Sequence, residues 1–571
     1  MINPNKSIII TTRMLRKIDL LYVLLISIIS LFLVFDIFLN KGQPATFDGT
    51  IHITTIAQYY RGLKEGEHRI TWADGFANYG MPIPLISQQT TPYLGGYLNF
   101  IFNNVLFSYN VVFLIGAFLS CLFYFIFLRI YFKPTIAFVG TLLFNFAPYR
   151  IINLYIRGDE PEFFASVFVP LVLIGIYLLI KKKSYFGFLL LTLSVGLLGL
   201  AHPFVLVVGS FLFFPYIIYC IHDEDRKKEL LFLTFLSFVL GSGITAFYTL
   251  PAYVESRYFY LGLEKNHFVP NQFLGLANFF DPRWYYYYKN DTFVRGNFIK
   301  VDLLETLITL IGLIILMFTI IKRRKESLLA FAVGTSFLLI FLMTSLSNIL
   351  YQRIGILNSL QFPWRVLTPF IFITPIILCI VLQKIKYRNV AIIIVIFLIS
   401  ALRYPQLYGK NYTVYPQSKY FFTIDNLHST ILNTVWTGKT SEYPLENQKP
   451  GIISGKGIIN KKIIKNSSRY YEINALTDLR MVDYTFYFPG WQVYIDGQKT
   501  QIQYQDPNYR GVITYNVPSG NHIVILKFED TKDRIAGYIL TILSLVAAFV
   551  IFFLLRRDFQ SRFVIPKVLR K

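Results

Sequence analysis

Long runs of apolar residues recur along the chain and alternate with short polar segments. Twelve of these runs are near the length that a helix needs to cross about 30 Å of hydrocarbon. They lie at residues 19–39, 109–128, 135–148, 163–180, 185–200, 203–221, 230–250, 303–321, 328–347, 366–383, 390–404 and 535–555, and the run at 135–148 is short. The pattern predicts a polytopic α-helical membrane protein with about 12 transmembrane helices.

Basic residues gather in every second connection between the apolar runs. The 571-residue chain has a formal net charge of +23, and such a charge on a soluble face would suggest a nucleic-acid partner. Here the lysines and arginines lie in short loops and in the tail, at 181–184, 222–229, 322–326, 384–388 and 556–571. The positive-inside rule therefore predicts a multi-pass protein of the cell membrane, with the lipid bilayer as its partner, both termini cytoplasmic and no nucleic acid.

The loops on the other side of the predicted membrane are longer. Those at 40–108, 149–162, 251–302 and 348–365 are sizeable, and the segment 405–534 has the size of a domain. We expect residues 1–404 to form a transmembrane part with about 11 helices, 405–534 an extracytoplasmic β-rich domain, and 535–571 the final helix and a basic cytoplasmic tail. In the first loop, apolar residues after Asp48 keep helical spacing, which predicts a helix along the membrane surface.

Within 405–534 the apolar residues repeat with a period of two, which is typical of strands. Trp491, Val493 and Ile495 lead into Asp496-Gly497, a common hairpin turn. A second hairpin is predicted around the turn at 518–521. Together these patterns predict a β-sandwich-like domain before the last helix.

Acidic residues beside the predicted spans on the outer side are few, and they are costly next to hydrocarbon unless they are used. They are Asp48, Asp159, Glu160, Glu162 and Glu255. The carboxylate of Asp48, just after the first span, could take a proton from an acceptor hydroxyl. The structural alternative is that Asp48 only caps the following helix, and acids beside a proline at 159–162 also suit a helix start.

Histidines and cysteines bear on possible metal sites. His52 lies four residues after Asp48, on the same face of a helix, but two ligands are too few for a metal site. His202, at the outer end of a span, could contact a substrate or simply satisfy the helix end. The three cysteines all lie inside apolar runs, so they provide neither a disulfide framework nor a zinc site. No metal site is assigned, and a divalent cation stays open as a cofactor.

Four arginines lie at membrane borders on the outer side, against the positive-inside trend. They are Arg150, Arg157, Arg353 and Arg365. A lipid phosphate would account for them, because guanidinium groups bind phosphate oxygens through two parallel hydrogen bonds. The structural alternative is that they pair with Glu162 or Glu255.

With these residues assembled, the chain resembles bacterial YfhO-type membrane proteins and their relatives labelled 6-pyruvoyl-tetrahydropterin-synthase-related, which are similar to the GT-C glycosyltransferase superfamily. The histidines of this sequence are scattered and do not form the zinc-histidine cluster of a pterin enzyme, so the name of these relatives does not indicate the function. The resemblance covers most of the chain and is carried by Asp48-Gly49-Thr50-Ile51-His52, Arg157-Gly158 with Glu162, Pro170-Leu171, His202, Leu250-Pro251-Ala252 with Glu255, Gln361-Phe362-Pro363-Trp364-Arg365, Glu442-Tyr443, Pro489-Gly490-Trp491, Asp496-Gly497 and Pro518-Ser519-Gly520.

The resemblance implies a GT-C-like enzyme that transfers a sugar from a polyprenyl-phosphate donor to an extracytoplasmic glycan or lipid acceptor. Asp48 matches the family's catalytic acid in the first outer loop. Donor-binding candidates are His52, Arg157, Asp159, Glu162, His202, Glu255 and Arg365. The chain departs from its relatives in having Asp159-Glu160 directly after Arg157-Gly158. Alternatives are a non-catalytic scaffold in cell-surface polysaccharide assembly, or a transporter of lipid-linked saccharides, although the nearly charge-free spans disfavour a transporter.

Overall fold

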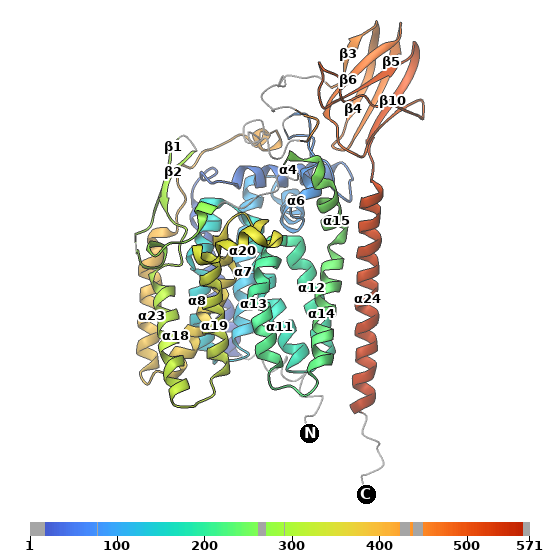
Figure 1. The fold of residues 1–571 in the computed structure, drawn as a ribbon. Helices are drawn as coiled ribbons and strands as arrows, with labels where there is room; N and C mark the ends of the chain where they lie inside the picture. The colour runs from blue at the N-terminus through green and yellow to red at the C-terminus, as the bar shows by residue number, and fades with distance from the viewer. Residues whose placement is uncertain are drawn as a thin grey trace.

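The computed structural model describes residues 17–563 with the exception of 77, 261–269, 282, 290–291, 423–433 and 438–448. Helices form a large body, and a smaller domain of strands sits beyond one end of it (Figure 1). This confirms a polytopic helical fold with a β-sheet region before the last helix.

The helical body is built from helices that run along its long axis, as Figure 1 shows. Apolar helices suit this role because a helix satisfies its backbone hydrogen bonds internally. The main axial helices are α2 (Lys17–Val34), α7 (Val105–Leu128), α8 (Pro134–Asn145), α11 (Phe168–Ile180), α12 (Tyr185–Ala201), α13 (Pro203–Ile221), α14 (Lys227–Ile244), α18 (Leu303–Ile321), α19 (Ser327–Met343), α22 (Leu367–Lys384), α23 (Arg388–Arg403) and α24 (Lys532–Phe563).

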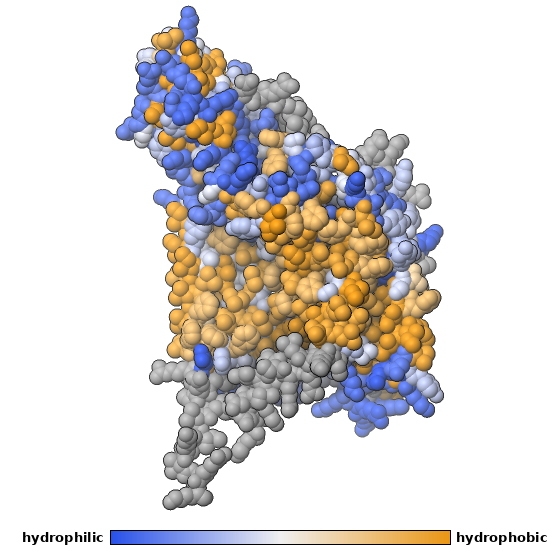
Figure 2. Space-filling model, turned by 180° about the vertical axis from the view of Figure 1, so that it is seen from behind, coloured by the Kyte–Doolittle hydropathy of each residue, from blue (hydrophilic) through white to orange (hydrophobic). Residues whose placement is uncertain are grey.

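Seven helices in the described part of the chain are long and apolar enough to cross a membrane, or up to ten if each of three bent pairs is one span. Two further apolar helices, Leu20–Val34 and Tyr185–Ala201, are shorter. The predicted number of about 12 spans therefore stays a prediction. Figure 2 shows a broad band of hydrophobic side chains on the visible face of the body, which is the surface that lipid would cover.

Shorter helices cover the end of the body nearest the strands. The helix predicted after Asp48 is present as α4 (Gly49–Lys64), which lies across this end in Figure 1. The other short elements that connect the axial helices are α3 (Asp36–Leu39), α5 (Ile83–Ile86), α6 (Thr90–Phe102), α9 (Pro148–Ile151), η1 (Ile152–Arg157), α10 (Glu160–Ala165), α15 (Ala246–Glu255), α17 (Ala277–Phe280), the strands β1 (Tyr285–Lys289) and β2 (Thr292–Asn297), α20 (Asn348–Arg353), α21 (Gly355–Asn358) and η5 (Pro363–Val366).

One of the bent helix pairs leads into a π-helical turn. α8 and the segment Pro148–Arg157 meet at an angle of 46°, and Pro148 stands at the start of the second helix. Residues 152–157 then form a π-helix, η1, whose wide turn ends at Gly158 with φ of 67°. π-helical turns are rare and often occur at functional sites.

The strands from β3 to β10 form two antiparallel sheets packed face to face, which we call the β-domain (residues 451–528). One sheet has the order β4-β5-β10-β7-β8 and the other β3-β6-β9. Buried side chains of both sheets, such as Tyr471, Met481 and Val524, share one core. The strands are β3 (Gly451–Ser454), β4 (Gly457–Ile464), β5 (Ser468–Ala475), β6 (Leu479–Phe486), β7 (Trp491–Ile495), β8 (Gln498–Thr500), β9 (Val512–Val517) and β10 (Gly520–Phe528).

The two predicted hairpins have different outcomes. The hairpin at Asp496-Gly497 is confirmed, because β7 pairs with β8 across this turn. The hairpin around 518–521 is wrong: β9 pairs with β6, while β10 pairs with β5 and β7 in the other sheet. The turn therefore leads the chain from one sheet to the other. The domain boundary at residue 405 stays a prediction, although the first strand of the described β-domain begins only at Gly451.

A buried ion network holds the β-domain against the loop after α4. Asp74, which is 6% exposed, accepts hydrogen bonds from Lys449 at 2.7 Å and from Arg469 of β5. The guanidinium of Arg61, at the end of α4, lies 3.4 Å from the same carboxylate. This network joins elements that are almost 400 residues apart in the sequence.

Candidate functional site

The loop before α4 runs beside the end of η1, and this contact creates the site. The backbone N–H of Phe47 donates to Ile156 O at 3.0 Å, and that of Asp48 donates to Arg157 O at 2.7 Å. Gly158 permits the close approach, because a Cβ there would lie 2.6 Å from Thr46 Oγ1 and 2.9 Å from Gly49 Cα. The sequence pair Arg157-Gly158 thus fixes the start of α4 against the turn that leads into α10.

Asp48 occupies the N-cap position of α4, but its side chain makes no capping hydrogen bond. The side chain is 43% exposed, and Oδ2 lies 4.0 Å from Arg157 Nε. The protein packed around the carboxyl raises the pKa of Asp48 above its ordinary value, although Arg157 opposes this effect. A capping role for Asp48 would require a hydrogen bond from its carboxylate to the helix, and this bond is absent. The carboxylate is instead accessible to solvent.

Arg157 holds two acids through a fork of hydrogen bonds. It donates to Asp159 Oδ2 at 2.5 Å and to Glu162 Oε2 at 2.7 Å, and its guanidinium lies over the ring of Trp364. Burial alone would favour a neutral acid, but Arg157 holds the pKa of Asp159 below its ordinary value. Arg157 was expected to be one of the arginines that bind phosphate, whereas the structure favours the alternative of pairing with Glu162.

His52 faces the acids at the start of α10. Its ring nitrogens lie 3.6 Å from Glu160 Oε2 and 4.0 Å from Asp159 Oδ1. Burial disfavours the imidazolium, but Glu160 and Asp159 outweigh it and raise the pKa of His52. Glu160 is fully buried, and its Oε2 has no hydrogen-bond partner. Glu160 was named among the acids beside the predicted spans but was not given a donor-binding role.

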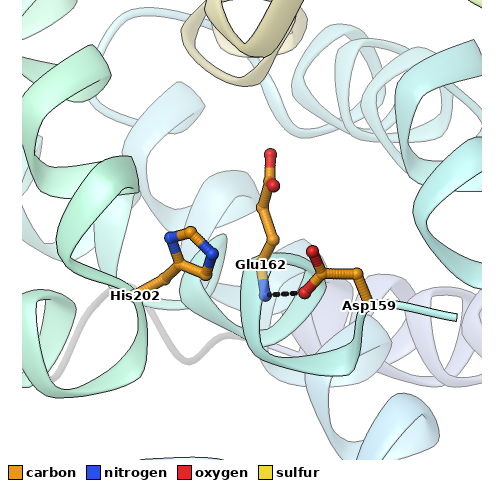
Figure 3. A group of neighbouring side chains, drawn as sticks. All are labelled: Asp159, Glu162 and His202. Atoms are coloured by element: carbon orange, nitrogen blue, oxygen red, sulfur yellow. Dashed lines mark hydrogen bonds between the residues drawn. The ribbon is translucent and has the colours of Figure 1, made fainter. Parts of the chain in front are cut away.

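His202 reaches the same acids from the junction of α12 and α13. It is 3% exposed, and its Nδ1 has no hydrogen-bond partner. Burial lowers the pKa of His202 to about 4, so the ring is neutral near pH 7. One ligand atom each from His202, Asp159 and Glu162 lie within 4.8 Å of one another. Figure 3 shows the histidine approaching the turn in which Glu162 N donates to Asp159. A histidine that only satisfied a helix end would not leave this nitrogen unpaired.

Arg365 completes the group from η5. It is close enough to act electrostatically on Asp48, Glu162 and His202. Its buried Nε and Nη1 have no hydrogen-bond partner, and its weak contact to Gln361 Oε1 measures 3.4 Å. Phe204 and Phe362 face the guanidinium. We call the following residues the charged cluster: Asp48, His52, Arg157, Asp159, Glu160, Glu162, His202 and Arg365.

Comparisons with known proteins place few constraints on this geometry. No protein-family model matches the chain, and no curated protein matches it either. Among solved structures, the chain is similar to the arabinofuranosyltransferase AftD from Mycobacteria, determined by single-particle cryo-EM, with a TM-score of 0.41 and 13% sequence identity. The match covers 68% of this chain and only 27% of AftD. The resemblance to YfhO-type proteins therefore stays a prediction.

Two groups of predicted residues lie apart from the charged cluster. Glu255 was a donor-binding candidate, but it accepts hydrogen bonds from Arg534 and Thr531 at the start of α24. This ion pair ties α15 to the helix that follows the β-domain. Arg150 is 1% exposed and donates to Ser166 between two phenylalanine rings, and Arg353 is exposed at the end of α20.

Some side chains around the cluster had no distinctive sequence signal. Tyr149 and Thr368 donate to Glu162 Oε1 at 2.6 Å and 2.9 Å, and Trp364 covers Arg157. Trp364 belongs to the motif at 361–365, but its role as a cover for a guanidinium depends on a contact across roughly 200 residues. Such contacts are not encoded in local spacing.

Replacing Gly158 with alanine should destabilise the protein. Gly158 has a left-handed conformation, and such backbone conformations cost a residue with a side chain about 1–3 kcal/mol; the clash with Thr46 adds to this. All three cysteines are buried, so a thiol-reactive fluorogenic dye reports thermal unfolding in detergent. Gly334→Ala is the control, because nothing lies within 4 Å of a Cβ at Gly334. Equal midpoints for both variants would contradict the prediction.

Proposed function

We propose that the protein is a membrane glycosyltransferase that transfers a sugar from a polyprenyl-phosphate donor to an acceptor on the membrane side that carries the β-domain. The observation that carries this proposal is one pairing of features. Asp48 is an accessible carboxylate without a capping role, and it belongs to the same charged cluster as Arg365, a guanidinium whose buried N–H groups lack partners. Sugar transfer from a polyprenyl phosphate needs both groups: a base for the acceptor hydroxyl and a hydrogen-bond donor for the leaving phosphate. The resemblance to GT-C enzymes in the motifs around both residues adds support.

In the proposed reaction Asp48 acts as general base. An acceptor hydroxyl gives its proton to the Asp48 carboxylate while its oxygen attacks the anomeric carbon of the sugar. The bond between that carbon and the phosphate oxygen breaks, and its electron pair leaves with the polyprenyl phosphate. Attack opposite the leaving group inverts the anomeric centre. Asp48 then returns the proton to solvent, to which it is open.

The leaving phosphate needs hydrogen-bond donors that are not already in use. Arg157 already serves Asp159 and Glu162, so its charge is largely offset within the cluster. Arg365 has no carboxylate within ion-pair distance among the described residues, and unpaired buried N–H groups are costly. A phosphate oxygen at Arg365 would satisfy them and place the donor beside Asp48. Arg157 is the second choice for this role.

A substitution at Arg365 tests this assignment. Arg365→Ala should weaken binding of a polyprenyl-phosphate sugar by about 10- to 150-fold, because loss of a charge-assisted contact costs about 1.5–3 kcal/mol. Arg365→Lys should recover only part of the affinity, since it keeps the charge without the fork. Binding is measured on purified variants in detergent. Arg353→Ala removes an exposed arginine of the same outer region and serves as the control.

Unchanged donor binding in Arg365→Ala would move the phosphate site, with Arg157 as the next candidate. If the wild-type protein bound no polyprenyl-phosphate sugar at all, the enzyme proposal would fail in favour of a non-catalytic scaffold. Mass spectrometry of lipids that copurify with the protein is an independent check on the donor.

A further inference from the structure

The charged cluster contains more negative than positive charge. The four carboxylates of Asp48, Asp159, Glu160 and Glu162 face two guanidinium groups and the titratable ring of His52. An anionic phosphate that enters this group meets an excess of negative charge, which opposes its binding. Arg365 by itself does not remove the excess.

One corner of the cluster has the composition of a cation site. Asp159, Glu162 and His202 are all at least 95% buried, and their ligand atoms lie within 4.8 Å of one another. The unpaired Nδ1 of His202 is an independent sign of a missing partner, because buried nitrogens are nearly always bonded. Figure 3 shows the ring beside the two acids.

The carboxylates have room for a further partner. An ionised carboxylate offers about four lone-pair positions. Asp159 uses two, for Arg157 and for Glu162 N, and Glu162 uses three, for Tyr149, Thr368 and Arg157. Both can therefore bind a metal without releasing Arg157. Ligand atoms of a tetrahedral metal stand about 3.4 Å apart at bond lengths near 2.1 Å. The three ligand atoms lie within 4.8 Å of one another, so they would move closer by up to about 1.4 Å when a metal binds.

We infer that Asp159, Glu162 and His202 form a binding site for a divalent transition-metal ion that accompanies the anionic donor. This inference rests on the proposed function for its role, but the site itself rests on the ligands. One imidazole with two carboxylates suits Mn²⁺ or Zn²⁺, whereas Ca²⁺ and Mg²⁺ prefer oxygen ligands alone. The ion offsets the excess negative charge and offers an open position to a phosphate oxygen. Transfer would then depend on a cation as well as on Arg365.

Mn²⁺ binding to the full-length protein in detergent is the direct test. After treatment with a chelator, wild-type protein should take up about one Mn²⁺ per chain, and pulsed EPR should show coupling to one imidazole nitrogen. His202→Asn should bind Mn²⁺ at least about 10-fold more weakly and lose the nitrogen coupling. His522→Asn, which changes a β-domain histidine paired with Asp496, is the matched control and should behave like wild type.

Thermal unfolding with the thiol-reactive dye verifies that each variant is folded. His202→Cys is a second variant, because a thiolate can still bind Zn²⁺ and should restore Zn²⁺ binding. Equal Mn²⁺ affinity in wild type and folded His202→Asn, or no uptake by wild type, would overturn the metal site. Full transfer activity in the presence of a chelator would contradict only the metal's role in transfer. Mn²⁺ binding by a protein that transfers no sugar would contradict only the proposed glycosyltransferase function.

Discussion

Asp48→Asn should reduce sugar transfer by about 10²–10⁴-fold, which is the usual contribution of a general base. Asparagine has nearly the same shape but cannot accept the proton of the acceptor hydroxyl. Donor binding should persist, because the proposed phosphate contact is at Arg365. The measurement is transfer and donor binding on the same purified variant. The difference between the two readouts distinguishes a catalytic role from a structural one.

The pH dependence of the transfer rate is a second test of Asp48 as the general base. A general base must be deprotonated, so the rate should fall as pH drops through the pKa of Asp48. This pKa is raised in the protein, so the decrease should begin above the pH of about 3.9 at which an ordinary aspartate titrates. Asp496→Asn is the control for Asp48→Asn and should keep the wild-type rate and pH dependence, since asparagine also suits the turn before Gly497. Wild-type rates in Asp48→Asn would eliminate the mechanism proposed here.

The second large effect concerns the attachment of the β-domain. Asp74→Asn should destabilise the contact between the loop after α4 and β5 by about 3–5 kcal/mol, because buried Lys449 and Arg469 would lose their shared counter-ion. Hydrogen exchange should accelerate in β5 and in the loop around Asp74. Thermal unfolding should begin at a lower temperature.

Glu472→Gln is the matched control for this prediction. Glu472 also pairs with a lysine, Lys461, but both side chains are exposed, at 40% and 54%. Exposed ion pairs contribute about 0–1 kcal/mol, so this variant should remain close to wild type. If Asp74→Asn changed hydrogen exchange no more than Glu472→Gln does, the network would not hold the β-domain in place.

Local patterns in the sequence identified those features that depend on near neighbours. Apolar runs predicted the axial helices, helical spacing after Asp48 predicted α4, and Asp496-Gly497 predicted the β7–β8 hairpin. Strand period did not identify the partner of each strand. The turn at 518–521 resembles a hairpin turn, but β9 and β10 bury their inner faces from opposite sheets. Both arrangements produce the same alternation of apolar residues.

The candidate site was predictable as a list of residues but not as a set of pairs. The sequence predicted that Asp48, His52 and Arg157 lie at the outer border of the membrane. Whether Arg157 binds an acid or a phosphate depends on the turn after η1, which local sequence patterns did not predict. Glu255 has a partner 279 residues further along the chain. Pairing at that separation is decided by the packing of helices, which no motif around Glu255 records.

The weak burial of α24 has a consequence for how this helix can vary. Only 6% of its membrane-crossing window is buried, although the helix has contacts along its length: Gly537 meets Ala246, Ser544 meets Gly243, and the ring of Phe552 packs on Tyr185. Ala548 is fully buried, whereas half of the side chains from 545 to 556 are exposed. The exposed side of the helix is specified by hydropathy instead of by residue identity, so other apolar residues could replace those on that side.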